Sequence, residues 1–362
     1  MISTDTEAER IPRKRRWLWW ALGGFGALLV LAAVGSAFLT LPYFVLSPGA
    51  ARPTSDLIHV SGARTYHSDG HISYMTVSLE RATALTAAMG WLDSSVAVVP
   101  EKDILGDQSP KQNEKQNLAD MADSKQVATA VALETLGYDV IKGTGAQLLY
   151  VDPKGPAHAA LKPGDTITTV GDKRIQSFAD LVRVLGSRRP GDTVRLGVDR
   201  YAGGKDEVSV TLGARSKKQP NSPFLGIAGH TRATIGQLPV QVTIDTGDVG
   251  GPSAGLAFTL SVLDALTPQD LTGGKRVATT GTMDLDGTVG LVGGVPQKTV
   301  AARRAGTQLF IVPSGEYKEA KRYAGKMDVE KADTIEQALK VLHDRVGANT
   351  ESLSRHAEAA LG

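Results

Sequence analysis

The sequence predicts an α+β fold in which a single N-terminal transmembrane helix precedes two folded domains. Three observations support this prediction. The chain has 362 residues, enough for about two domains. A long stretch near the N-terminus is apolar and uncharged, and from residue 136 onwards short β-type runs alternate with helical ones. The hydrophobic content of 41% and the charged content of 22% are typical of folded chains.

The composition excludes several classes of function. The chain has no cysteine, which excludes disulfides, zinc–cysteine sites, iron–sulfur clusters and thiol catalysis. The net charge is only +2, so no overall field attracts nucleic acid, and we expect no nucleic-acid partner. No metal or other cofactor is expected, because His67 and His71 have no third ligand spaced with them and are expected to be a surface pair.

A membrane-spanning helix is expected over residues 17–41, which carry no charge. As a helix this segment is about 37 Å long, enough to cross a bilayer with some tilt. Trp17, Trp19 and Trp20 suit the membrane interface. Residues 1–16 form a basic tail that, by the positive-inside rule, stays in the cytoplasm. The sequence therefore predicts a single-pass protein of the cell membrane whose remaining chain is extracytoplasmic.

A cleaved signal peptide is the alternative interpretation of this segment. Gly35, Ser36 and Ala37 imitate the small residues of a cleavage site. The apolar run continues past them to Leu46, which is longer than the hydrophobic region of most signal peptides. An uncleaved anchor is therefore favoured.

Residues 50–135 form an extracytoplasmic connecting region with the weakest pattern in the chain. Alternation predicts a strand over residues 71–79. The polar stretch 100–117 is expected to be a loop with fragments of helix, followed by a helix that Ser124 caps and Gly137 ends. No chemistry is expected in this region.

A domain of short strands and turns is expected over residues 136–215. Its strings "DPKGPAHAALKPGDTITTVGDKRI" and "RPGDTVRLGV", on either side of a helix that begins at Ser177 or Phe178, resemble a PDZ domain of the bacterial protease type. The resemblance implies a β-sandwich-like fold that binds peptides. The strands are expected at residues 146–151, 166–170, 193–198 and 207–212.

The same resemblance implies a peptide-binding loop at Leu136-Gly137-Tyr138. Its backbone N–H groups would receive the C-terminal carboxylate of a peptide, beside a strand edge that accepts an added strand. The alternative is that Leu136 and Gly137 only end a helix. Residues 215–221 are polar, contain a proline and are expected to be a linker.

The first of two glycine clusters runs from Gly247 to Gly255. It follows a strand expected over residues 240–244 and precedes an apolar helix expected over residues 256–266. Ser253 is therefore expected at a helix N-terminus, where free N–H groups hold a developing oxyanion. The alternative is that Ser253 is an ordinary helix cap.

The second cluster, Gly293 to Lys298, opens another helix, which ends before Gly306. Lys298 lies in the first turn and faces the same side as three small residues, Ala301, Ala302 and Ala305. Burial and the helix dipole both lower the pKa of a lysine, and a base near neutral pH needs a shift of about three units from ~10.4. The alternative is a lysine that extends to solvent.

A neutral lysine beside such a serine is the arrangement of a Ser-Lys hydrolase. The strings "GGPSAGLAFTLSVLDALT", "VATTGTMDLDGTVGLVGGVPQKTVAARRAG" and "LFIVPSG" resemble the proteolytic domain of Lon proteases. The resemblance implies a Lon-type α/β proteolytic domain over residues 222–345, followed by a polar tail at residues 346–362.

By this resemblance Ser253 is the nucleophile, Lys298 is its general base and Thr280 orients the lysine. Gly251 and Pro252 are expected to give catalytic support, with backbone N–H groups of the turn holding the oxyanion. The chain departs from the family in two places. Val249-Gly250-Gly251 stands where Lys-Asp-Gly is usual, with Asp248 displaced, and Thr282 stands where an acidic residue is usual.

With its N-terminal anchor and PDZ domain, the chain looks like the membrane-bound PDZ–Lon-like proteins of bacteria. The resemblance implies protein or peptide substrates and homo-oligomeric rings. A nucleotide-binding Gly-x4-Gly-Lys-Ser/Thr is absent from the sequence, since Arg276 follows Gly273-Gly274-Lys275. The expected function is that of a membrane-anchored, ATP-independent serine endopeptidase whose PDZ domain selects substrates.

Two other functions stay open. A non-catalytic, membrane-tethered PDZ adaptor would keep the fold but lose the serine or the lysine, and both are present. An esterase of the α/β-hydrolase type is the second, because Gly251–Gly255 also satisfies Gly-x-Ser-x-Gly. That reading needs a downstream histidine, for which the chain offers His343 and His356.

Overall fold

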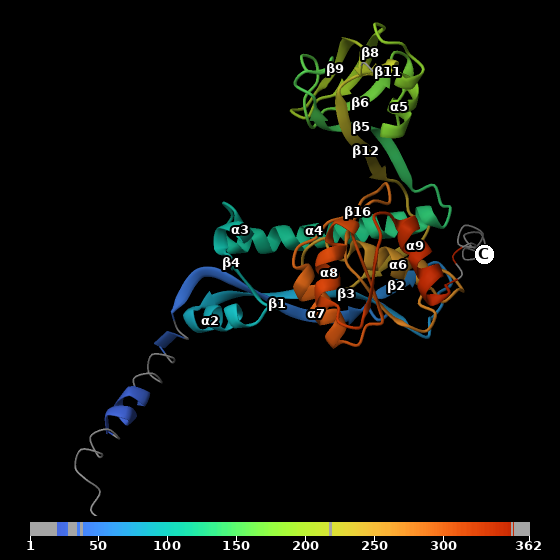
Figure 1. The fold of residues 1–362 in the computed structure, drawn as a ribbon. Coiled ribbons are helices and arrows are strands. Elements are labelled where there is room, and N and C mark those ends of the chain that lie inside the picture. The colour runs from blue at the N-terminus through green and yellow to red at the C-terminus, as the bar shows by residue number, and fades with distance from the viewer. Residues whose placement is uncertain (1–19, 28–34, 37–38, 217–218, 349, 351–362) are drawn as a thin grey trace, which may run out of the picture.

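A computed structural model describes residues 20–27, 35–36, 39–216, 219–348 and 350 (Figure 1). The expected cytoplasmic tail, residues 17–19, 28–34 and 37–38 of the expected membrane segment and most of the expected polar tail lie outside these residues. Residues 20–27 and 35–36 are helical. Within the described ranges, no helix combines the length and the apolar content that a membrane span requires.

A six-stranded mixed sheet forms the centre of the larger domain, in the order β18-β17-β14-β3-β1-β4. β14, β17 and β18 run parallel to β3, whereas β1 and β4 are antiparallel to their neighbours. The strands are β1 (Thr40–Pro53), β3 (His71–Thr83), β4 (Ala97–Pro100), β14 (Arg276–Thr279), β17 (Leu309–Val312) and β18 (Asp328–Lys331).

This sheet corrects the expectation of a separate connecting region at residues 50–135. β3 lies in the middle of the sheet and pairs with β14, from far along the chain, in the register Tyr74↔Thr279. Single-strand patterning indicated a strand here but gave no information on its partner. The region therefore supplies β3, β4 and the end of β1 to the central sheet of the larger domain.

Helices cover the sheet and close its core. The helices of the larger domain are α2 (Ala84–Leu92), α3 (Glu101–Leu105), α4 (Pro110–Thr135), α6 (Gly255–Leu266), α7 (Val295–Arg304), α8 (Tyr317–Tyr323) and α9 (Ile335–Val346), with a 3-10 turn η1 (Ser314–Glu316). The apolar helix α6 is buried along nearly its whole length between the sheet and α4, where Phe258 packs on Tyr74. Two small two-stranded sheets complete the domain, β2 (Ile58–Ser61) with β13 (Gln241–Ile244) and β15 (Thr282–Met283) with β16 (Val289–Gly290).

The long helix α4 begins earlier than the sequence suggested. Ser109, not Ser124, is its N-cap, in a reciprocal capping box with Gln112, and Pro110 occupies the first turn. Polar residues fill the first half of this helix, so its apolar period is weak there and the capping residues are the better signal. The end at Gly137 agrees with the prediction, since Leu136 is the C-cap.

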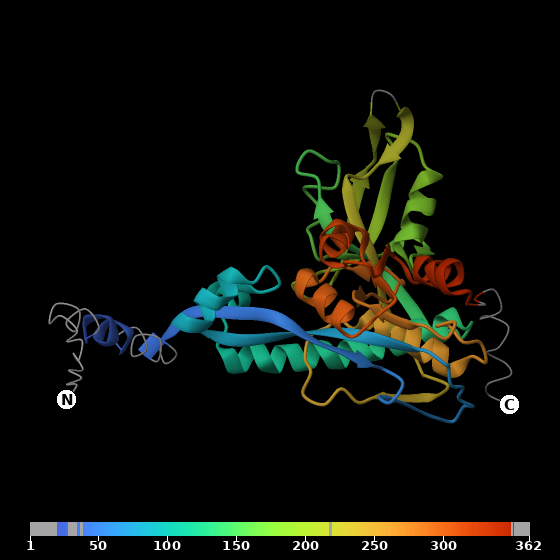
Figure 2. The ribbon, with the colours of Figure 1, turned by 60° about the horizontal axis from the view of Figure 1, so that its bottom comes forward.

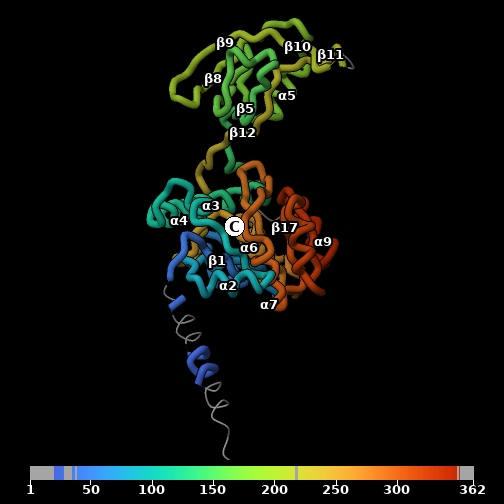
Figure 3. The backbone as a smooth tube through the Cα atoms, turned by 60° about the vertical axis from the view of Figure 1, so that its left-hand side comes forward, coloured from blue at the N-terminus to red at the C-terminus, as the bar shows by residue number. Residues whose placement is uncertain are grey.

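A second domain, hereafter the inserted domain, spans residues 141–235 and has its own core (Figures 1 and 3). Its sheet has the order β12-β5-β6-β8-β9, with β7 beside β6. Its elements are β5 (Ile141–Val151), β6 (Thr166–Val170), β7 (Lys173–Arg174), α5 (Phe178–Gly186), β8 (Thr193–Asp199), β9 (Lys205–Thr211) and β12 (Ile227–Ile235).

The linker expected at residues 215–221 belongs instead to a hairpin of this domain, β10 (Gly213–Ser216) and β11 (Gln219–Phe224). The chain enters the inserted domain through β5 and leaves it through β12, and these two strands pair antiparallel. The domain is thus inserted between the two halves of the larger one.

The long strands β1 and β3 extend beyond the core together with β4, α2, α3 and the first half of α4 (Figure 2). We call this projection the arm. Residues 39 and 40, where the chain arrives from the apolar N-terminal segment, lie on the arm beside the start of α2. The arm therefore connects the N-terminal segment to the rest of the larger domain.

Candidate active site

Ser253 lies on the turn that leads into α6, two residues before the first helical residue, Gly255. The N-cap is Ala254, with no side-chain cap bond, so the Ser253 hydroxyl is not used as a helix cap. The carbonyl of Ser253 accepts hydrogen bonds from Gly281 N (3.0 Å) and Thr280 Oγ1 (3.3 Å). The backbone of the serine is thereby fixed to the strand end that follows β14, while its side chain is half-buried.

The helix α4 holds this turn from the other side. Gly251 N donates to Asn117 O (2.7 Å), and Ser124 Oγ donates to Pro252 O (3.1 Å). A Cβ added to Gly250 would approach Asn117 Cβ to 2.9 Å, so the close approach requires glycine. The connecting region, in which no chemistry was expected, therefore positions the turn that carries Ser253.

These contacts change which backbone groups can hold an oxyanion. Gly251 N–H is already donated to Asn117, and Pro252 has no N–H. The amides of Ser253 and Ala254 have no acceptor among the described residues, so they are the donors this turn offers. Gly251 and Pro252 support the site by shaping the turn rather than by donating to the substrate.

Lys298 lies in the first turn of α7, which begins after Gly294 in a left-handed conformation (φ 71°). Lys298 is 3% exposed; on the same helix Ala301 and Ala302 are buried as expected, whereas Ala305 is exposed. Burial lowers the pKa of Lys298 to about 8, although the charge of Glu316 opposes the shift. A substantial fraction of this amine is therefore neutral slightly above neutral pH.

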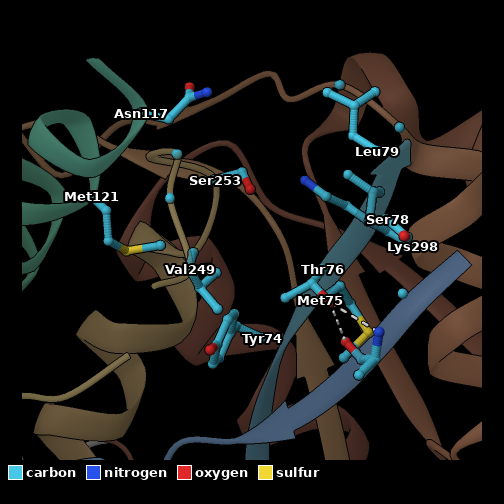
Figure 4. A pocket seen from close by; sticks show the side chains of 18 of the residues that line it. Tyr74, Met75, Thr76, Ser78, Leu79, Asn117, Met121, Val249, Ser253 and Lys298 are labelled. Carbon is cyan, nitrogen blue, oxygen red and sulfur yellow. Dashed lines mark hydrogen bonds between the residues drawn. The ribbon is translucent and has the colours of Figure 1, made fainter. Parts of the chain in front are cut away.

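Thr280 connects the lysine to the serine turn. Its Oγ1 accepts a hydrogen bond from Lys298 Nζ (3.2 Å) and donates to Ser253 O. Because the hydroxyl proton of Thr280 is committed to that carbonyl, the amine must be the donor in the first bond. A neutral amine held in this way keeps its lone pair for another proton, and in Figure 4 the Lys298 side chain extends toward Ser253.

A cleft of about 760 Å³ contains both side chains (Figure 4). Its walls come from β1 and β3, from the Gly-rich turns on either side and from α4. Most of the lining is apolar and includes Leu46, Met75, Val77, Leu79, Met121 and Val249. The arm thus forms one side of the candidate site.

Glu316 is a nearby acidic residue that sequence reasoning missed. Its Oε1 accepts from Val292 N (2.6 Å), in the loop that leads to the Gly293-Gly294 turn, while its buried Oε2 has no hydrogen-bond partner in the part of the chain that the structure describes. Burial raises the pKa of Glu316. The family pattern places its acidic residues close to the serine and after Thr-Gly in the sequence. Glu316 instead comes directly after the "LFIVPSG" string.

The expected triad histidines do not support the esterase interpretation. His343 lies on α9, where its Nδ1 pairs with Ala348 O (2.9 Å), and it is not among the residues that line the cleft. His356 lies outside the described residues. Thr282 stands where the Lon family usually has an acidic residue, and it is not one of the residues that line this cleft. The displaced Asp248 does line the cleft.

The expected peptide-binding loop, Leu136-Gly137-Tyr138, forms the end of α4. The amides of all three residues donate within the helix end, to Ala132 O, Glu134 O and Leu133 O. Leu136 packs in the core of the larger domain. The helix-cap alternative describes this geometry, and the three amides are not available for a carboxylate.

The open sheet edge of the inserted domain is instead β12, the outermost strand beside α5. Phe178 N donates to Thr231 Oγ1 (3.1 Å), which holds the start of α5 along this strand. The turn before β12 contains Leu225 and Gly226, whose carbonyls accept from Ala157 N and Asp152 N, whereas their amides have no acceptor among the described residues. The run "PFLGI" before an alternating strand was the sequence signal for this edge.

Comparison with known proteins identifies two domains in the chain. Residues 231–344 match the family model for the Lon protease (S16) C-terminal proteolytic domain, and residues 118–212 match the model for the PDZ domain. The Lon protease of Malacoplasma penetrans is 32% identical over 144 residues, which are 39% of this chain and 17% of that protein. The Lon protease of Ureaplasma parvum serovar 3 is 31% identical over 110 residues, 30% of this chain and 13% of that protein.

The chain thus spans less than a fifth of the length of these curated relatives. Among solved structures, the PDZ domain of an SdrC-like protein from Listeria innocua is 30% identical and covers 24% of this chain and 96% of that one, with a TM-score of 0.22. The domain assignment rests on the family models. A Lon protease C-terminal proteolytic domain and a PDZ domain are found in this chain, within a mixed α/β fold.

Proposed function

We propose that the protein is a serine endopeptidase that uses Ser253 as nucleophile and Lys298 as general base. The observation that carries the proposal is the buried amine of Lys298, with a pKa near 8 and a hydrogen bond to Thr280, in the same cleft as a serine whose hydroxyl has no other role. A buried lysine is costly, and such perturbed groups gather at functional sites.

The reaction begins when Ser253 Oγ attacks the scissile carbonyl and Lys298 Nζ takes its proton. The amides of Ser253 and Ala254 donate to the oxygen that becomes negative. The lysine then gives its proton to the leaving amine, and an acyl-enzyme remains. Water, deprotonated by the same lysine, releases the second product and restores the enzyme.

Protein or peptide substrates fit the open, largely apolar cleft. We propose that the inserted domain selects them, with a substrate segment adding as a strand to the free edge of β12 beside α5. We also propose that the chain is anchored in the cell membrane by residues 17–41, with the cleft outside the cytoplasm, and that hydrolysis needs no ATP. The support for the anchor is the uncharged segment behind a basic tail.

The decisive experiment measures cleavage of an unfolded protein substrate by the wild-type chain and by the Ser253→Ala and Lys298→Arg variants. Arginine keeps charge and approximate size but cannot give up its proton at working pH, so both variants should lose activity at least ~10³-fold. The double variant should be no worse than either single one, because the residues act as one unit. Normal activity in Lys298→Arg together with loss in His343→Ala would favour the esterase alternative, and an inactive wild-type chain would favour the adaptor.

Substrate selection is tested with Val182→Glu, an exposed position on α5 of the inserted domain. A charge beside the β12 edge should raise KM for a protein substrate while kcat/KM for a short fluorogenic peptide is unchanged. An equal change for both substrates would show that the inserted domain does not select.

A further inference from the structure

We propose that the outward side of α2 lies in the headgroup region of the lipid bilayer and holds the arm against the membrane. We use the name apolar face for the exposed Leu85, Met89 and Leu92 on one side of α2, together with Trp91 next to Leu92 and Leu39 just before β1. The inference rests on the membrane anchoring proposed above and adds a second, separate contact with the lipid.

The helix α2 exposes its large apolar residues and buries small ones, which is the reverse of a normal surface helix. From Thr83 to Leu92 the chain carries no charged residue. The helical residues it buries are the small ones, Ala87 and Gly90, while Trp91 is 78% and Leu92 89% exposed. Surface helices of soluble domains show the opposite pattern, with large apolar residues inward and charges outward.

Tight packing explains why the small residues face inward. A Cβ added to Gly90 would approach Val98 Cγ2 to 2.9 Å, because α2 lies directly on β4. The helix therefore cannot rotate to bury its large side chains against the protein without opening this contact. Its apolar face is a fixed, outward feature of the arm.

The position of α2 points to lipid as the occupant of this face. Ala84 N donates to Leu39 O (2.9 Å), and Thr40 pairs with Thr83, so α2 starts where the chain leaves the apolar segment 17–41 (Figure 1). If that segment crosses a bilayer, its exit places the apolar face at the membrane surface. Tryptophan and leucine on one side of an uncharged helix are suited to the boundary between headgroups and acyl chains.

The experiment uses the small number of tryptophans in the chain, which are Trp17, Trp19, Trp20 and Trp91. The full-length variant with Trp17→Phe, Trp19→Phe and Trp20→Phe keeps Trp91 as its one tryptophan. It is reconstituted into phosphatidylcholine–phosphatidylglycerol vesicles whose acyl chains carry bromine either near the headgroup or near the chain end. We expect the Trp91 emission to be blue-shifted and to be quenched at least twofold more by the shallow bromines than by the deep ones.

The matched control replaces all four tryptophans with phenylalanine and carries Tyr201→Trp, an 80% exposed position on the inserted domain. Its emission should not change with either brominated lipid. Cleavage of a soluble peptide by both variants reports that they are folded.

The outcomes separate the two proposals. Protein that floats with the vesicles while Trp91 is not quenched overturns the lipid contact and leaves the anchor intact. Protein that does not float overturns both. A Trp91 emission that is blue-shifted, unquenched and dependent on protein concentration assigns the apolar face to a second copy of the chain and also overturns the lipid contact.

Discussion

The two halves of the proposed dyad are held in place by different physics. Ser253 lies on an irregular turn and is positioned by hydrogen bonds from residues distant in sequence, on α4 and after β14. Lys298 lies in a regular helix and is positioned by burial, with one hydrogen bond from its amine. The serine half therefore depends on long-range polar contacts, whereas the lysine half is tuned by desolvation where α7 packs on β1, β3 and α8.

The largest effect should come from the lysine half, in Lys298→Met. Activity should fall at least ~10³-fold. Stability should rise, because the wild-type pKa of about 8, against an ordinary value of 10.5, makes burial of the charged lysine cost up to about 3 kcal/mol. The unfolded chain binds the extra proton between these two pH values, so wild-type stability increases with pH in that window.

Urea unfolding of both proteins across pH checks this prediction. The advantage of the variant should be greatest below about pH 8 and disappear by about pH 10.5. A difference that does not depend on pH would show that Lys298 is not titrated by burial.

In the serine half, Gly250 is the position that tests how closely the turn packs against α4. In Gly250→Ala, the new Cβ meets the backbone and side chain of Asn117 and shifts the turn. We expect kcat to fall about 10²-fold, since small misplacements of a reacting group have such effects. Gly293→Ala is the matched control, because its Cβ meets nothing within 4 Å, and its kcat should be close to that of the wild type.

The link between the halves is tested by Thr280→Val. Loss of one hydrogen bond to the amine and one to Ser253 O should reduce kcat about tenfold, with little change in KM. The neighbouring Thr279→Val is the control, because the buried Thr279 Oγ1 has no partner among the residues described and its removal should not reduce activity or stability. Equal losses in the two variants would indicate a general packing defect.

The smallest effect is expected at Glu316, which acts on the lysine through charge alone. In Glu316→Gln, the amide oxygen still accepts from Val292 N, but the charge that raises the pKa of Lys298 is gone. The ascending limb of the pH profile of kcat/KM should therefore move to lower pH, by less than about one unit. A shift to higher pH would contradict this electrostatic contact.

Lys298 and Ser253 also differ in how much the sequence predicts about their surroundings. The periodicity of one helix indicated correctly that Lys298 is buried, but not that β1, β3 and α8 are the elements that bury it. The support of Ser253 is not local, since Asn117 and Ser124 lie more than a hundred residues upstream, and no periodic pattern relates them to the turn. The two glycine clusters could be placed beside each other from the family resemblance, but not from spacing.

The fold shows a parallel difference. Strands and helices with clear turn residues around them, such as β6 and α5, occur at the predicted positions. The place of β3 beside β14 in the central sheet could not be read from the sequence, because pairing between strands over two hundred residues apart leaves no mark on either strand alone. For the same reason β12, which follows a predicted linker, was not assigned to the inserted domain.

The junction between the inserted domain and the larger one determines how the two domains can be separated by protein engineering. Ile141 and Ile235 lie directly opposite each other, and Gly236 N donates to Val140 O (2.7 Å) just before them. The inserted domain thus begins and ends at one antiparallel pair, the same geometry that a tight turn closes in a β-hairpin. Replacement of everything beyond this pair by a two-residue Asn-Gly turn leaves the surrounding chain at its native spacing, so the larger domain and the inserted domain can be exchanged as separate modules.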